Sequence, residues 1–306
     1  MIEQEKLSKE QIQYEFERLQ DSICMALEEA DGLGKFKEDK WQRAGGGGGK
    51  TRIIQGKIIE KGGVNFSAVH GQLPVKTGEA LKFPKDSWFF ATGVSIVLHP
   101  HNPHIPIIHM NVRYFEVKPN QNDIAPEWWF GGGIDLTPHY VVEEEARDFH
   151  RQLKEACDLH DPNHYPKFKK WADDYFYLPH REETRGVGGI FFDRLSGGEK
   201  LNHFEFVKSL GNAFSPIYTK LMKNNSEKPF SEKEKDWQLH RRGRYVEFNL
   251  VWDKGTKFGL DTNGRTESIL MSLPSIAKWT YNYEIENNSP EEKTLALLKK
   301  GINWVN

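Results

Sequence analysis

One stretch of the sequence combines a carboxylate, bulky aromatic residues and three consecutive glycines in a single strand-like run. Residues 128–138 read Trp-Trp-Phe-Gly-Gly-Gly-Ile-Asp-Leu-Thr-Pro. Side chains alternate between the two faces of a strand, so Asp135 shares a face with Gly131 and Gly133. Glycine inside a strand marks either a bulge or a place where a ligand or another backbone comes close. The run therefore predicts a bulge or a carboxylate placed beside space for a ligand.

Two upstream stretches, 88–99 and 107–117, also alternate between an apolar side and a side with polar, reactive groups. If all three stretches are antiparallel neighbours, their polar sides line one ligand-facing surface. A solvated polar face without a ligand is the alternative. The residues expected on this surface are Ser95, His99, His109, Asn111, Arg113 and Asp135.

Histidines are the second chemical signal, because neutral imidazoles bind divalent metals, donate protons near neutral pH and hydrogen-bond carboxylates. His150, on an expected helix, and His180, after a Tyr-Phe-Tyr-Leu-Pro run, are distant candidates to join His99 and His109. The chain lacks an HExxH helix and a two-histidine, one-carboxylate pattern. A hydrogen-bonded structural imidazole is the alternative at each position, and the residues alone do not choose.

Arginines indicate the charge of a ligand. The planar guanidinium matches carboxylates with two parallel hydrogen bonds, so Arg113 and Arg265 beside a glycine-floored cleft would suit a flat polycarboxylate. For the cluster at 241–244, salt bridges or a dimer contact are favoured over substrate binding.

Composition bounds the class of protein. The chain has 306 residues, of which 37% are hydrophobic and 28% charged, and no linker divides it, so one domain spanning 1–306 is expected. A net charge of −2 gives no case for nucleic acid or a membrane surface. Cys24 and Cys157 are too few for a disulfide framework and indicate a reducing compartment. No signal peptide or membrane-spanning run is seen, which favours a cytoplasmic protein.

The elements that must position these residues come in blocks rather than in strict strand–helix alternation. This order predicts an α+β fold with a large, mainly antiparallel sheet. Helices are expected over 8–31, 143–160, 166–176, 200–223, 231–240 and 290–298. Strands are expected over 51–60, 64–69, 88–99, 107–117, 128–138, 244–252 and 257–261, with a tight turn at Asn263-Gly264.

The glycine run at 44–51, Ala-Gly-Gly-Gly-Gly-Gly-Lys-Thr, fits a phosphate loop only if its first position is relaxed from Gly to Ala. A phosphate loop needs an apolar strand before it and a helix after it. Here a polar segment precedes and β-branched residues follow, so a flap or a close-packed turn is the preferred interpretation.

Longer strings of the sequence resemble one family, the oxygen-dependent coproporphyrinogen III oxidases, over nearly the whole chain. The strings are Val-Asn-Phe-Ser at 64–67, His-Pro-His-Asn-Pro at 99–103, Asn-Val-Arg-Tyr-Phe at 111–115, and the segments 128–138, 169–178, 185–193, 241–251 and 264–272. The resemblance implies a flat antiparallel sheet covered by helices on both sides, a homodimer and a cytosolic enzyme of haem biosynthesis. It implies oxidative decarboxylation of two propionates of coproporphyrinogen III to vinyl groups, giving protoporphyrinogen IX, with O₂ as co-substrate and no organic redox cofactor.

The resemblance also implies roles for individual residues. Asp135 would contact pyrrole N–H groups, Arg113 would hold a propionate and His109 would donate a proton. The substrate-binding positions would be Ser95, Asn111, Val112, Arg113, Asn263, Gly264 and Arg265. A divalent metal such as Mn²⁺, required in some members only, would be held by His99, His109, His150 and His180. Two roles thus fall on His109.

These residues suggest a mechanism in which the substrate itself supplies the electrons. Asp135 would stabilise or remove a pyrrole proton, the activated ring would reduce O₂, and an oxygen species would take a propionate hydrogen before CO₂ leaves. Two other classes stay open. A tetrapyrrole carrier would bind without consuming O₂, and a phosphate-loop NTPase would explain residues 44–51 only.

Overall fold

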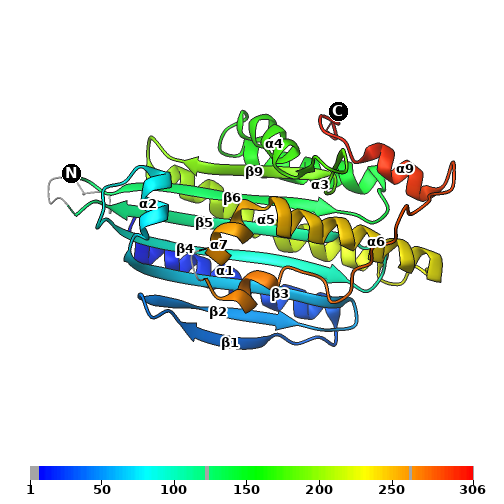
Figure 1. The fold of residues 1–306 in the computed structure, drawn as a ribbon, viewed down its shortest axis with the longest axis horizontal. Helices are drawn as coiled ribbons and strands as arrows, with labels where there is room; N and C mark the ends of the chain where they lie inside the picture. Colours follow the sequence, from blue (N-terminus) through cyan, green and yellow to red (C-terminus); the bar gives the residue numbers. More distant parts are fainter. Residues whose placement is uncertain (1–6, 121–123, 262–263, 306) are drawn as a thin grey trace.

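The computed structural model describes residues 7–120, 124–261 and 264–305, and its centre is an antiparallel sheet. Seven strands follow one another in chain order, and each pairs antiparallel with its neighbour (Figure 1). The α+β fold expected from the sequence is confirmed. The strands are β1 (Lys37–Gln42), β2 (Gly47–Ile54), β3 (Ile59–Gln72), β4 (Trp88–Pro100), β5 (Ile107–Lys118), β6 (Glu127–Thr137) and β9 (Gly188–Leu195).

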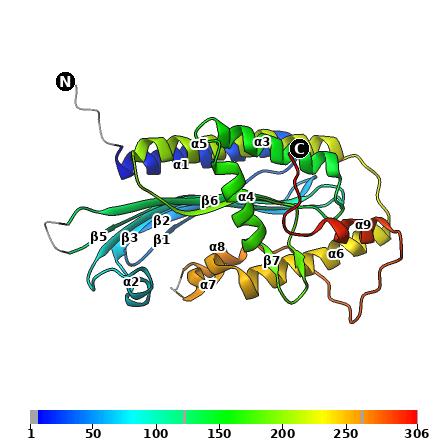
Figure 2. The same cartoon turned by 90° about the horizontal axis from the view of Figure 1, so that it is seen from above.

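Helices cover both faces of the sheet (Figure 2). One layer contains α1 (Lys9–Asp31), α3 (Glu143–Asp158) and α5 (Lys200–Asn225), and the other contains α6 (Glu232–Glu247), the π-helix η1 (Phe248–Trp252), α7 (Lys254–Asp261) and α8 (Thr266–Leu270). The remaining elements are α2 (Val75–Leu81), α4 (His164–Tyr175), α9 (Pro290–Leu297) and the short strands β7 (Tyr177–Leu178) and β8 (Glu183–Thr184). In the described ranges, no helix is long and apolar enough to cross a membrane.

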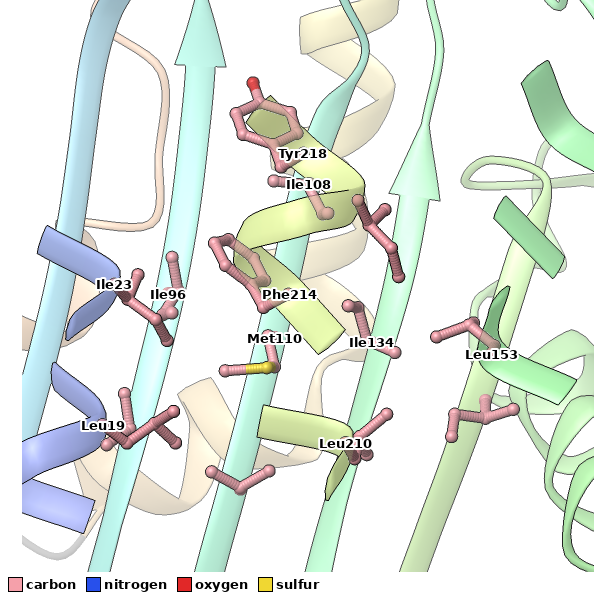
Figure 3. Close-up of a cluster of buried hydrophobic side chains, with 14 of the residues drawn as sticks. Leu19, Ile23, Ile96, Ile108, Met110, Ile134, Leu153, Leu210, Phe214 and Tyr218 are labelled. Carbon is pink, nitrogen blue, oxygen red and sulfur yellow. The ribbon is translucent and has the colours of Figure 1, made fainter. Parts of the chain in front are cut away.

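The apolar core lies between the sheet and the layer of α1, α3 and α5 (Figure 3). Ile96, Met110 and Ile134 project from neighbouring strands and are fully buried, as is Phe214 of α5. Burying one such side chain stabilises the fold by about 1.5–3 kcal/mol. Because every second residue of each strand is committed to this core, the intervening residues must face the other layer.

The helices expected from periodicity are confirmed, with ends that differ by at most two residues except in α6, which ends at Glu247 rather than at residue 240. Ser8 caps α1 as expected, because its side chain accepts from the N–H of Gln11 while the Gln11 side chain accepts from the N–H of Ser8. Gly32 ends the helix with φ of 79°, a left-handed conformation that suits glycine.

The strands predicted over 244–252 and 257–261 are wrong. Helix α6 continues to Glu247, η1 follows it, and α7 covers 254–261. Tyr245 and Phe248 are fully buried, three residues apart, so the apolar period is helical rather than alternating. Asp253 then caps α7 by accepting from the N–H and the hydroxyl of Thr256, each at 2.7 Å.

The boundary between the second and third strands was also placed wrongly. Residues 61–63 lie inside β3 and pair with β4, and the chain turns instead at residues 55–58. Met271, which follows α8, packs against Gly63, so a side chain at position 63 would collide with Met271. Gly47, Gly48 and Gly49 belong to β2, which pairs on both sides, and no helix follows them. The phosphate-loop alternative is therefore excluded, and the predicted turn at Asn263 lies outside the described residues.

Candidate active site

The polar residues expected on one face of the sheet do lie together, because β4, β5 and β6 pair directly. Ser95 lies opposite Asn111, which lies opposite Gly133. Two residues further along each strand, His109 lies opposite Asp135. These residues alternate with the buried apolar ones, so they face the layer of α6, η1 and α8. The predicted polar surface is confirmed.

Asp135 is almost completely buried, with 1% of its surface exposed. The Nη2 of Arg185 donates to its Oδ1 at 2.9 Å and to its Oδ2 at 2.7 Å. The Nδ1 of His109 lies 2.8 Å from Oδ1. Burial alone would raise the pKa of Asp135, but the charge of Arg185 and the hydrogen bond from His109 outweigh burial and lower it. Asp135 is therefore an ionised carboxylate that only accepts hydrogen bonds.

Arg185 sits in a cage of aromatic rings. Its guanidinium carbon lies 4.4 Å from the ring centroid of Phe176, 4.6 Å from that of Tyr245 and 4.7 Å from that of Phe248. Its Nη1 donates to Asn249 Oδ1 at 2.9 Å. Burial opposes the charge of Arg185, yet Asp135 more than compensates and raises the pKa of the guanidinium. The cage thus fixes a cation under the carboxylate.

Sequence reasoning did not predict Arg185 or Asn249 as site residues. They lie 50 and 114 positions from Asp135, counted by residue number, on a loop and on η1. The one available signal was that each falls in a string that resembles the family, 185–193 and 241–251 respectively.

His109 is the most exposed member of the group formed by Arg185, Asp135 and His109. Since Asp135 can only accept, His109 donates through Nδ1, and its neutral ring then carries the lone pair on Nε2. The side chain is 21% exposed, and Nε2 makes no hydrogen bond to any residue that the structure describes. The imidazole of His109 therefore connects the buried Asp135 carboxylate to the polar face.

Arg113 lies two strand positions beyond Asn111 on the same face. Its Nη1 donates to Asn111 Oδ1 at 2.6 Å and its Nη2 to Asp193 Oδ1 at 2.8 Å. The side chain is 34% exposed and crosses Gly131, where a Cβ atom would lie 2.7 Å from the guanidinium. A carboxylate ligand would find this guanidinium already oriented.

The glycines of 131–133 do not leave empty space. Arg113 fills the position beside Gly131, and a Cβ on Gly133 would lie 2.6 Å from the carbonyl oxygen of Ile190. A bulge also interrupts the pairing of β6 with β9 next to Gly131. Both structural interpretations of the glycines, a bulge and close approach of another group, are therefore found.

The other predicted substrate-binding residues are dispersed. Val112 is fully buried on the opposite, apolar face, so its side chain is not available to a ligand on the polar face. Arg265 pairs with Asp39 of β1. Gly264 contacts Gly259 through its backbone N–H at 2.8 Å, and Asn263 lies outside the described residues.

The histidines assigned to a metal by resemblance are not brought together. His150 lies on α3 in the other helix layer, with Nδ1 2.9 Å from the hydroxyl of Tyr165 and Nε2 2.9 Å from the carbonyl of Val187. Burial lowers the pKa of His150 to about 3, so the ring is neutral with both nitrogens engaged.

His180 and His99 are engaged elsewhere. His180 contacts Glu247 through Nε2 at 2.8 Å and accepts from the indole N–H of Trp252 through Nδ1 at 3.0 Å. His99 places Nε2 2.9 Å from the carbonyl of Ser272. No group of three or more His, Cys, Asp or Glu among the described residues suits a metal ion. The four histidines therefore do not fit a shared metal site.

The arginines at 241–244 form salt bridges, as favoured from the sequence. Arg241 pairs with Glu183 at 2.8 Å and Arg244 with Glu247 at 3.1 Å. Arg242 is fully buried and holds both oxygens of Glu60, at 2.8 and 2.9 Å.

Comparison with known proteins shows the family of the chain. The coproporphyrinogen III oxidase family matches residues 11–304. The oxygen-dependent coproporphyrinogen-III oxidase of Drosophila melanogaster is 50% identical over 297 residues, covering 94% of this chain and 76% of that protein. The protein of that name from Prochlorococcus marinus (strain NATL1A) is 49% identical and covers 94% and 88%, and the chloroplastic one from Glycine max is 48% identical and covers 98% and 82%.

Proposed function

We infer that this chain, which belongs to the coproporphyrinogen III oxidase family, converts coproporphyrinogen III to protoporphyrinogen IX with O₂ as co-substrate. Each turnover of one propionic acid side chain, R–CH₂CH₂COOH, with O₂ gives the vinyl group R–CH=CH₂, CO₂ and H₂O₂. The substrate loses two electrons per vinyl group formed and O₂ gains them, so the reaction balances without an organic redox cofactor. Two such steps complete the conversion.

The observation that carries the proposal is the Arg185–Asp135–His109 unit on the polar face. It places an ionised carboxylate, bound by the caged Arg185, behind an imidazole whose Nε2 has no hydrogen-bond partner among the described residues. A carrier has no need for such a unit, whereas an enzyme that activates a pyrrole ring needs a group that accepts its N–H.

We assign the direct contact with the substrate to His109 rather than to Asp135. Neutral His109 presents a lone pair at Nε2 that accepts a pyrrole N–H, and protonated His109 can return a proton. Asp135 is buried beneath it and keeps the proton on Nδ1. The low pKa of Asp135 makes it a poor base, so of the two roles suggested by the sequence, stabilising charge is favoured over removing a proton.

Arg113 is assigned to a propionate. It reaches the polar face from the strand that carries His109, and Asn111 and Asp193 hold its guanidinium at a fixed angle. Ser95, opposite Asn111, extends the same surface. With a propionate bound to Arg113, the macrocycle would lie over the part of the sheet between Arg113 and His109.

The test is to incubate the purified, chelator-treated protein with coproporphyrinogen III under air and under argon. The tetrapyrroles are then oxidised to porphyrins and separated by chromatography. Protoporphyrin under air only, with one H₂O₂ per vinyl group, supports the oxidase. Binding of the substrate without product in either gas would support the carrier, and restoration by Mn²⁺ alone would support a metal requirement.

Two further properties belong to the proposal. A homodimer is supported by exposed apolar side chains around η1, since Leu250, Val251 and Trp252 are 46, 47 and 39% exposed. A Leu250→Glu variant should then sediment as a monomer while the parent protein sediments as a dimer. A cytoplasmic location is supported by two free, buried thiols, Cys24 and Cys157, and is tested by cell fractionation.

A further inference from the structure

The bulge between β6 and β9 brings two consecutive residues to the polar face. In the pairing of these strands, Phe130 lies opposite Leu195 and Gly132 opposite Phe192. Two residues of β9, Asp193 and Arg194, therefore stand against the single residue Gly131. A bulge of this kind turns both side chains to one side of the sheet instead of alternating them.

Arg194 adopts an unusual backbone conformation at this bulge, with φ of 50°. The left-handed region is disfavoured for residues with a Cβ atom. The contacts of the side chains show where the bulge directs them. Asp193 reaches Arg113 at 2.8 Å, and the guanidinium of Arg194 lies 5.8 Å from the ring centroid of Trp129.

Trp129 belongs to a row of aromatic rings on the same face. It stacks on Phe115 with ring centroids 4.8 Å apart and on Phe83 with centroids 6.4 Å apart. Phe115 in turn stacks on Phe89 at 5.8 Å. These rings are partly exposed and directly continue the polar surface beyond Arg113. They give Arg194 a flat, apolar base.

Among the residues that the structure describes, Arg194 has no partner of opposite charge. It is exposed, and within the described ranges it makes no ion pair or hydrogen bond, in contrast to Arg113, Arg185, Arg241 and Arg242. Gly131 separates it from Arg113, so two guanidiniums flank one position of the sheet. That position lies four residues from Asp135, about 13 Å along an extended strand.

We propose that Arg194, seated on the ring of Trp129, forms a second carboxylate subsite that holds a propionate which the reaction leaves intact. The inference rests on the proposed function. The product retains two propionates on neighbouring pyrrole rings, and Arg113 and Arg194 offer two cations side by side. The aromatic row beneath Arg194 suits the apolar methylene arm of the propionate and excludes water from one side of the ion pair.

The test compares Arg194→Gln with the parent protein in two assays. Affinity is measured under argon, where the reaction lacks O₂, by quenching of protein fluorescence with coproporphyrinogen III. KM and kcat are measured under air. We expect Kd and KM to rise about fivefold, as for the loss of one exposed charged hydrogen bond, with kcat within twofold. Arg194→Lys should recover part of the affinity.

Arg18→Gln is the matched control, because Arg18 lies 5.8 Å from the ring centroid of Tyr14 on α1, in the other helix layer. It should change neither constant. A porphyrinogen that carries ethyl groups in place of the two surviving propionates should bind equally to the parent protein and to Arg194→Gln. Arg194→Gly, which relieves the backbone conformation, should melt no lower than the parent protein.

Unchanged Kd for Arg194→Gln would overturn the subsite. An equal loss of affinity for the ethyl analogue would also overturn it, because the effect would then not depend on a carboxylate. Failure of the proposed function is a separate result, since it would be seen as absence of vinyl product from the parent protein while binding under argon can still be measured.

Discussion

The ion pairs Arg185–Asp135 and Arg242–Glu60 each have a buried guanidinium. Both guanidiniums are at most 3% exposed, and both carboxylates have a lowered pKa although burial opposes ionisation. The surroundings differ. Arg242 also binds the backbone oxygen of Pro100 at 2.8 Å, which ties α6 to β4.

The first pair has a different third partner, the imidazole of His109, which continues to the polar face. Glu60 also lies 3.5 Å from Lys235 Nζ and 3.8 Å from His101 Nδ1, and the second distance is too long for a hydrogen bond. The hydrogen bond between His109 and Asp135 can fix a proton and a charge for a ligand on the polar face, whereas the contacts of Glu60 hold elements together. Burial and a shifted pKa therefore do not distinguish a catalytic ion pair from a structural one. The hydrogen bond to His109, which lies on the polar face, distinguishes Arg185–Asp135.

The largest difference between the two ion pairs is expected when each arginine is replaced in turn. Arg185→Met should lower kcat at least ~100-fold, because Asp135 loses the charge that keeps it ionised and His109 loses its fixed tautomer. Arg242→Met should leave kcat of the folded protein within about threefold. Arg185→Met removes the cation from a buried carboxylate and should lower the free energy of unfolding by about 3–5 kcal/mol. Arg242→Met should lower it less, because Lys235 stays 3.5 Å from the partly exposed Glu60.

Steady-state kinetics at a temperature well below both melting transitions separates the two outcomes, and urea denaturation measures the stability. Equal losses of kcat in the two variants would mean that the pairs do not differ in function.

The two faces of β4 and β5 should respond differently to substitution, because one packs in the apolar core and the other is the polar face. Val112→Ala removes fully buried core volume and should lower the free energy of unfolding by about 2 kcal/mol without changing KM. Ser95→Ala alters the polar face and should raise KM about threefold, with stability changed by less than about 0.5 kcal/mol. Urea denaturation and KM for coproporphyrinogen III check both. A larger effect of Val112→Ala on KM than on stability would contradict the placement of Val112.

A smaller effect is expected from the amide that completes the arginine cage. Asn249→Ala removes the hydrogen bond to Arg185 Nη1 but leaves Asp135 and the aromatic rings in place. We expect kcat to fall about fivefold, as for the loss of one hydrogen bond to a charged group. The same variant with Arg185→Met should be no slower than Arg185→Met alone, because both act through one guanidinium. Additive losses would show that Asn249 acts independently.

The smallest effect is on acid stability. Asp135 and Glu60 have pKa values lowered by folding from ordinary values of 3.8 and 4.5. A lowered pKa stabilises the folded protein above the ordinary value, and this contribution is lost as pH falls through the folded-state value. The free energy of unfolding should therefore decrease below about pH 5, and Glu60→Gln should flatten that decrease. Urea denaturation from pH 6 down to about pH 3 measures the slope, and a variant with the slope of the parent protein would contradict the lowered pKa of Glu60.

The sequence was sufficient where the information was local. Alternation over 88–99, 107–117 and 128–138 placed Ser95, Asn111 and Asp135 on one face, because the period of a strand determines which side chains share a face. Capping at Ser8 determined where α1 begins. These features depend on residues within a few positions of one another.

The sequence was insufficient where distant segments meet. Arg185, which binds Asp135, comes from a loop before β9, and Asn249, which binds Arg185, comes from η1, and no periodicity connects these residues. The segment 244–261 alternates enough to suggest strands, but burial of Tyr245 and Phe248 in the opposite layer makes it helical. The bulge that directs Asp193 and Arg194 is likewise a property of pairing, which one strand alone does not specify.

The most direct test of the central role of the Arg185–Asp135–His109 unit is a single turnover of Asp135→Asn. The variant and the parent protein are loaded with coproporphyrinogen III under argon and mixed with oxygenated buffer, and vinyl products are quantified over time. We predict equal loading within about threefold and a first decarboxylation at least ~100-fold slower in the variant. Conversion of the bound substrate at the parent rate would contradict the role of this carboxylate.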